Sequence, residues 1–105
     1  MKKIAVVILN WNGRKLLEEF LPSIVRFSTE ATIYVADNAS SDDSVAFIKN
    51  TYPTVKIIQN TDNFGFAKGY NQALRFVEED YYALVNSDIE VTENWLSPIV
   101  ELFEN

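Results

Sequence analysis

The chain has 105 residues, of which 48% are hydrophobic and 13% aromatic, enough apolar material for one packed domain and too much for a disordered chain. Cysteine and histidine are both absent, which excludes disulfides, thiolate nucleophiles, Cys/His zinc sites and Ser-His-Asp triads. The net charge of −6 argues against nucleic acid as a partner, and an anionic ligand would need a cation, backbone N–H groups or a helix N-terminus.

No apolar run approaches the roughly 18 residues of a membrane span. The short run at residues 4–9 is followed by Asn10-Trp11-Asn12 instead of the small residues of a cleavage site, so it is not expected to be a signal peptide. We therefore predict a cytoplasmic location, which includes the inner face of the membrane.

Apolar runs and apolar residues at helical spacing alternate along the whole chain. The runs lack strict alternation, which is typical of strands buried on both faces in a parallel sheet. The expected elements, in chain order, are a strand at residues 3–9, a helix at 13–27, a strand at 32–36, a helix from cap candidates at 39–43 to about Lys49, a strand at 55–59, a helix at 66–79, a strand at 81–85 and a last helix capped by Thr92.

Two of the expected helices contain residues that disfavour a regular helix. Pro22 should kink or split the first helix, because proline lacks an N–H and clashes with the preceding turn. Gly69 costs about 1 kcal/mol in a helix interior, so a close approach by another group is expected there. The last helix is expected to face the core through Trp95, Leu96, Ile99, Val100 and Phe103.

This order predicts a single α/β domain over residues 1–105, with a three-layer α/β/α architecture around a mostly parallel four-stranded sheet. Ligands of such sheets bind outside the carboxyl ends of the strands. Each expected strand ends in polar residues, and four parallel strands would gather them at one edge. These clusters are Asn10-Trp11-Asn12, Asp37-Asn38, residues 60–63 and Asn86-Ser87-Asp88.

Asp88 is a candidate ligand for Mg²⁺ or Mn²⁺, because hard cations take oxygen ligands and keep water or phosphate in the remaining positions. The alternative is that Asp88 caps the turn into the last helix. Asp37 could accept a hydrogen bond from a ring N–H of a uracil or thymine, or it could form a turn with its own backbone. Trp11 could flank a base or simply pack.

Residues 63–71 place a glycine loop at the start of a helix, with Lys68 in the first turn. Backbone N–H groups in that position suit a phosphate. The stretch is neither a P-loop nor a GxGxxG fingerprint, because the longer glycine loop, the Lys-Ser/Thr pair and the glycine spacing are missing.

Four motifs in order resemble the inverting family 2 glycosyltransferases of GT-A fold, which are Rossmann-like, and above all their rhamnosyltransferase-like members. They are VILNWNG at residues 7–13, VADNASSD at 35–42, NFGFAKGYN at 63–71 and LVNSD at 84–88. The resemblance covers the whole chain, and it implies a transferase that acts on a nucleoside-diphosphate sugar in polysaccharide biosynthesis.

The resemblance also implies roles for individual residues. Leu9, Asn10 and Trp11 match the strand end that contacts the nucleobase, and Asp37 matches its base-binding aspartate. The Asp-x-Asp motif reads Asn86-Ser87-Asp88, so Asp88 inherits the metal, Mg²⁺ or Mn²⁺, and Asn86 the ribose or a structural role. The residues that match the glycine loop and helix beside the sugar-nucleotide pocket are Asn63, Gly65, Lys68 and Asn71.

The chain ends at Asn105, soon after Asp88, so we expect the donor-binding half without the acceptor half and its general base, whose identity stays unassigned. The expected partners are a UDP- or dTDP-linked sugar and an acceptor glycan or lipid-linked sugar. A half-domain would leave a sheet edge uncovered, and a homo-oligomer is expected through it.

Two other functions are compatible with this pattern. One is a non-catalytic nucleotide-binding or interaction module that kept the fold. The other is a phospho-acceptor regulatory domain, which ranks last because Asn10 and Asn12 stand where that class carries an acidic pair.

Overall fold

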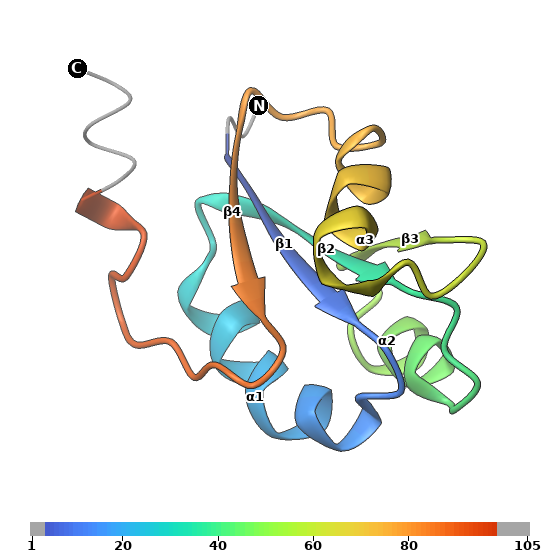
Figure 1. The fold of residues 1–105 in the computed structure, drawn as a ribbon. Helices are drawn as coiled ribbons and strands as arrows, with labels where there is room; N and C mark the ends of the chain where they lie inside the picture. Colours follow the sequence, from blue (N-terminus) through green and yellow to red (C-terminus); the bar gives the residue numbers. More distant parts are fainter. Residues whose placement is uncertain (1–3, 99–105) are drawn as a thin grey trace.

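The structure, a computed structural model, describes residues 4–98. Strands and helices alternate, and the four strands form one sheet in the order β3-β2-β1-β4 in which every neighbouring pair is parallel. The predicted α/β class with a parallel sheet is confirmed (Figure 1). The elements are β1 Ile4–Asn10, α1 Arg14–Phe27, β2 Ala31–Asp37, α2 Ser44–Thr51, β3 Lys56–Gln59, α3 Gly65–Leu74 and β4 Tyr81–Asn86.

The sheet is covered on both faces, by α1 and α2 on one side and by α3 on the other (Figure 1). β1 is buried on both faces because it lies between β2 and β4, which explains its continuous apolar run. Ile4, Val6 and Ile8 pack in the core beside α1 and α2, whereas Ala5 and Val7 pack on the α3 side.

The α3 side is covered less completely. Its core joins Tyr34 of β2 to Tyr70 and Ala73 of α3. On β4, which forms one edge of the sheet, Tyr82 and Leu84 pair with Ala5 and Val7 of β1 and therefore share this face, and both are about half exposed. An apolar stripe thus remains open beside the edge strand.

Two features of the first three helices differ from expectation. α1 is one uninterrupted helix of 14 residues that contains Pro22, so the expected split does not occur. α3 ends at Leu74 instead of residue 79, because three acidic residues at 78–80 oppose the negative end of the helix dipole.

The last helix also begins later than expected. Turns continue past Thr92, and helical structure starts at Ser97 and Pro98, where proline suits the first turn of a helix. Leu96 is nevertheless fully buried and Trp95 packs against the core, as predicted. The core positions expected further along, Ile99, Val100 and Phe103, lie outside the described residues.

Within residues 4–98, none of the helices combines the length and the apolar character that crossing a membrane requires.

Candidate functional site

The carboxyl ends of the four strands lie on the same side of the sheet, as their parallel arrangement requires (Figure 1). We call this side the strand-end edge, which is distinct from the outer strands β3 and β4. In the register of the sheet, Asn10 pairs with Asp37, and Leu9 pairs with Asn86. The structure therefore brings together the ends of β1, β2 and β4 that were predicted to form one site.

Asp37 lies buried at the centre of this edge, with 2% of its surface exposed. Its Oδ1 accepts hydrogen bonds from Asn10 Nδ2 at 2.9 Å and from Ser40 Oγ at 2.7 Å, and its Oδ2 accepts one from the Ser40 backbone N–H at 2.9 Å. The bond to the Ser40 backbone matches the turn-forming alternative for Asp37. The carboxylate thus fixes both the end of β1 and the loop after β2.

Replacing Asp37 with asparagine is expected to lower the free energy of unfolding by about 2–3 kcal/mol, because an N–H₂ group would then face a buried donor from Asn10 or Ser40. Urea denaturation measures this loss. Asp80→Asn is the matched control, since Asp80 is exposed and forms none of these bonds. Equal losses for the two variants would contradict a role for Asp37 in holding the loops.

A second set of bonds joins the β1–α1 loop to the β2–α2 loop, and we call it the loop clamp. Asn12 Oδ1 accepts from the backbone N–H groups of Ser41 at 2.7 Å and Asp42 at 3.1 Å, and the Asn12 N–H donates to Ser40 Oγ at 2.9 Å. Asn12 has a positive φ of 49°, which asparagine tolerates better than most residues. Trp11, just before it, is 54% exposed, so packing in the core does not account for it.

Asn38 and Asn60, two buried asparagines, hold α3 on the ends of β2 and β3. Asn60 Nδ2 donates to Asn38 Oδ1 at 2.7 Å and to the Gly69 carbonyl at 3.1 Å, while Asn38 Nδ2 donates to the Gly65 carbonyl at 3.0 Å. A Cβ on Gly69 would lie 2.6 Å from Asn38 Nδ2. The close approach expected at this glycine is therefore made by the Asn38 side chain.

The start of α3 presents the predicted glycine-loop residues at the same edge. Gly65 has a φ of +77°, and its N–H donates to Asn63 Oδ1 at 3.1 Å. Asn63, Gly65, Lys68 and Asn71 are all exposed, and Lys68 Nζ lies 4.9 Å from the centre of the Phe64 ring. The positive end of the helix dipole and a lysine are thus open to an anion at this edge.

Asn86 is the last residue of β4 and Asp88 lies two residues beyond it, and both are exposed. Ser87 and Asp88 form a turn directly after β4, and helical structure begins only at Ser97, so Asp88 lies in a turn and is not the N-cap of the last helix. Among the described residues, no group of three or more acidic side chains is arranged to hold a metal ion. Asp88 could supply one hard oxygen ligand, which fits a cation whose shell is completed by water and phosphate but not a site built by protein alone.

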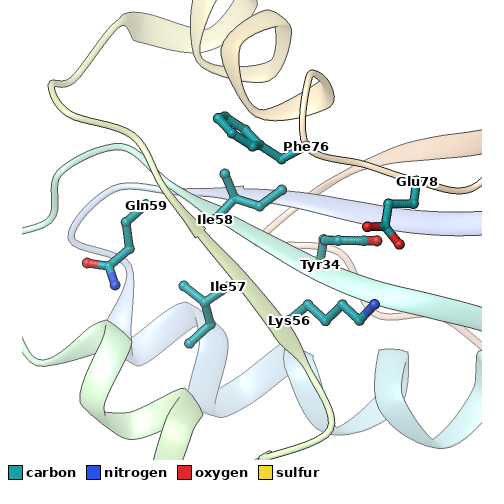
Figure 2. Close-up of a pocket in the computed structure, with 7 residues that line it drawn as sticks. All are labelled: Tyr34, Lys56, Ile57, Ile58, Gln59, Phe76 and Glu78. Atoms are coloured by element: carbon teal, nitrogen blue, oxygen red, sulfur yellow. The ribbon is translucent and has the colours of Figure 1, made fainter.

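A separate hollow of about 390 Å³ lies along the outer edge of β3 and contains none of the predicted site residues (Figure 2). Phe76 and Ile58 line it on the α3 side, and Ile57 points toward the opposite face. Burial, together with the hydrogen bond that Tyr34 donates to Glu79 at 2.7 Å, raises the pKa of the Tyr34 hydroxyl to about 12. Because no predicted site residue lines this hollow, the carboxyl ends of the strands remain the candidate site.

The sequence analysis placed Asn12, Asn38 and Asn60 at this edge but gave them no role in shaping it, and it assigned no hydrogen bond there to Ser40 or Tyr70. Asn12-Gly13 carried a turn signal, and Asn38 and Asn60 each follow an apolar run. Neither pattern indicates which groups these side chains hydrogen-bond to.

A family model for glycosyl transferase family 2 matches residues 5–105. Several solved structures share the fold. The mannosyltransferase PcManGT from Pyrobaculum calidifontis, in complex with GDP-Man and Mn²⁺, is 21% identical with a TM-score of 0.84, over 98% of this chain and 32% of that one. S. aureus TarS 1–349 in complex with UDP-GlcNAc is 24% identical with a TM-score of 0.84, over 99% of this chain and 31% of that one. The chain thus spans about a third of the length of these proteins.

Proposed function

The chain belongs to glycosyl transferase family 2, and we propose that it forms the donor-binding part of an enzyme that transfers a sugar from a nucleoside diphosphate to an acceptor hydroxyl with inversion. The observation that carries this proposal is the meeting of three polar strand ends and the start of α3 at one edge of a parallel sheet. The rhamnosyltransferase-like character of the motifs belongs to the same proposal.

In this proposal, the ends of β1 and β2 bind the nucleobase. In this proposal the exposed Trp11 flanks the ring of the base, and Leu9, which is half-buried, lies two residues before it at the end of β1. Asn10 Oδ1 is buried against Gly13 and has no hydrogen-bond partner among the described residues, so it keeps acceptor capacity at the end of β1. Within residues 4–98, Asp37 Oδ2 accepts one hydrogen bond, which leaves it capacity for a ring N–H from a base that enters between the loops.

The rest of the nucleotide lies against α3 and the end of β4. The exposed N-terminus of α3 faces the phosphates with Lys68, while Asn63, Gly65 and Asn71 shape the wall beside them. Asn86 holds the ribose, and Asp88 is the ligand of Mg²⁺ or Mn²⁺. When bound, the cation supplies positive charge for the departing diphosphate. PcManGT, which has this fold, is described with Mn²⁺ and GDP-Man bound.

The acceptor, a glycan or lipid-linked sugar, and the general base that takes its proton are assigned to no described residue of this chain. The open edge of β4, with Tyr82 and Leu84 half exposed, supports the proposed homo-oligomer. A non-catalytic nucleotide-binding module is the second candidate, favoured by Asn86 in place of an acidic residue. It predicts nucleotide binding without sugar transfer by the full-length protein.

The binding site is tested by calorimetric titration of the folded chain with UDP, dTDP and GDP, each with and without Mn²⁺. At least one diphosphate is expected to bind, and Mn²⁺ is expected to tighten its binding. Uridine and thymidine serve as controls, and they should gain nothing from Mn²⁺ because they lack the diphosphate. If no nucleotide binds to the folded protein under any condition, the proposal is wrong.

A further inference from the structure

Tyr70 lies in the second turn of α3 and is 2% exposed. Its ring packs against the sheet beside Val7 and Ala73, and the ring of Phe66 meets it edge-on with centroids 5.1 Å apart. A phenylalanine could fill the same space without burying a hydroxyl. The position of that hydroxyl therefore needs an explanation.

The hydroxyl bridges two strands. It accepts a hydrogen bond from the backbone N–H of Leu9 on β1 at 3.3 Å and donates one to the backbone carbonyl of Val85 on β4 at 2.9 Å. Leu9 pairs with Asn86, and in a regular parallel ladder the N–H of a residue points to the carbonyl just before its partner, which here is Val85. The hydroxyl of Tyr70 thus lies between two groups that the ladder itself brings together.

The bridge lies near the carboxyl ends of both strands, at the last residue of β1 that pairs with β4 and at the next-to-last residue of β4. One residue beyond it on β1 is Asn10, and one residue beyond it on β4 is Asn86, which leads to Asp88. Tyr70 also belongs to the helix whose first turn presents Gly65 and Lys68 at the same edge. A single hydroxyl therefore connects β1, β4 and α3, three of the four elements that form the proposed donor site.

We propose that Tyr70 is a positioning residue, whose hydroxyl sets the spacing between the ends of β1 and β4 and so places Asp88 relative to the nucleobase-binding residues. This inference rests on the proposed function. Tyr70 touches no reacting group and acts through the backbone of Leu9 and Val85. Removing the hydroxyl is therefore expected to weaken the metal-dependent part of nucleotide binding. It should not change the contacts that the nucleobase makes at the end of β2.

The test is Tyr70→Phe, with Tyr34→Phe as the matched control. Tyr34 is a second buried tyrosine of the same core, and its hydroxyl donates to Glu79, away from the strand ends. We expect Tyr70→Phe to reduce the Mn²⁺-dependent gain in diphosphate affinity about tenfold, as loss of groups that orient metal ligands does, while metal-free affinity changes little. Tyr34→Phe should leave both affinities unchanged.

A second measurement does not depend on nucleotide. In amide NMR spectra without ligand, Tyr70→Phe is expected to shift the signals of Leu9, Asn86 and Asp88, and Tyr34→Phe is not. Unchanged signals at these residues, or an unchanged Mn²⁺-dependent gain, would overturn the positioning role. Wild-type protein that binds no nucleotide would overturn the proposed function and this inference with it. A wild type that binds, beside a Tyr70→Phe variant that binds equally well, overturns only this inference.

Discussion

Replacing Asp88 with alanine is expected to abolish the increase in diphosphate affinity that Mn²⁺ produces. Asp88 is the exposed carboxylate at the end of β4, and the described residues hold no acidic cluster that could replace it. Loss of groups that only orient a ligand weakens metal binding by about 10- to 100-fold, so loss of the ligand should cost at least as much. Calorimetric titration of UDP, dTDP and GDP, with and without Mn²⁺, measures the change.

The matched control is Glu90→Ala, which removes another exposed carboxylate of the same loop. It should lower the Mn²⁺-dependent gain only slightly, through the general loss of negative charge near the site. If the two variants behave alike, the cation is attracted by the overall negative charge and not bound by Asp88.

Replacing Gly69 with alanine is expected to destabilise the protein, although the same change stabilises most helix interiors by about 1 kcal/mol. The new Cβ would lie 2.6 Å from Asn38 Nδ2 and 3.0 Å from Leu9 Cδ1. Asn38 cannot swing away, because it is 1% exposed and its amide joins Asn60 to the Gly65 carbonyl. Overpacking of this kind costs about 1–3 kcal/mol, which urea denaturation measures.

Gly65→Ala distinguishes this clash from a general intolerance of alanine in α3. A Cβ at Gly65 would have no atom within 4 Å, but the residue has a φ of +77°, which costs a non-glycine residue about 1–2 kcal/mol.

Enlarging the space at Gly69 should rescue only Gly69→Ala. In the double variant with Asn38→Ala, the added cost of alanine at residue 69 should therefore fall to what the remaining contact with Leu9 Cδ1 imposes. If the whole cost persists, Asn38 is not the residue that requires this glycine.

The strands and their common edge could be predicted because they depend on patterns that are local in sequence. The apolar run at residues 3–9 needs burial on both faces, and only a central strand of a parallel sheet offers that. Once the strands are parallel, the positions of Asn10, Asp37 and Asn86 at one edge follow from topology alone.

The hydrogen-bond partners at the edge could not be predicted in this way. Helical spacing shows that Tyr70 is buried, but its hydroxyl partners on β1 and β4 depend on how α3 is tilted over the sheet. The same holds for Asn38 and Asn60, whose amides meet across separate loops. The early end of α3 could not be predicted from apolar spacing, because the spacing continues to residue 77 while the acidic residues at 78–80 disfavour a helix that reaches them.

The loop clamp determines when the conformational entropy of the site is lost. Fixing the backbone of one residue costs about 1–2 kcal/mol, and Asn12, Ser40 and Ser41 are already held by one another in the free protein. A ligand that enters between these loops therefore meets a surface whose ordering was completed during folding. Binding therefore does not have to offset the entropy of ordering these loops. The affinity for a ligand at this edge depends on the folding stability of the loops as well as on direct contacts.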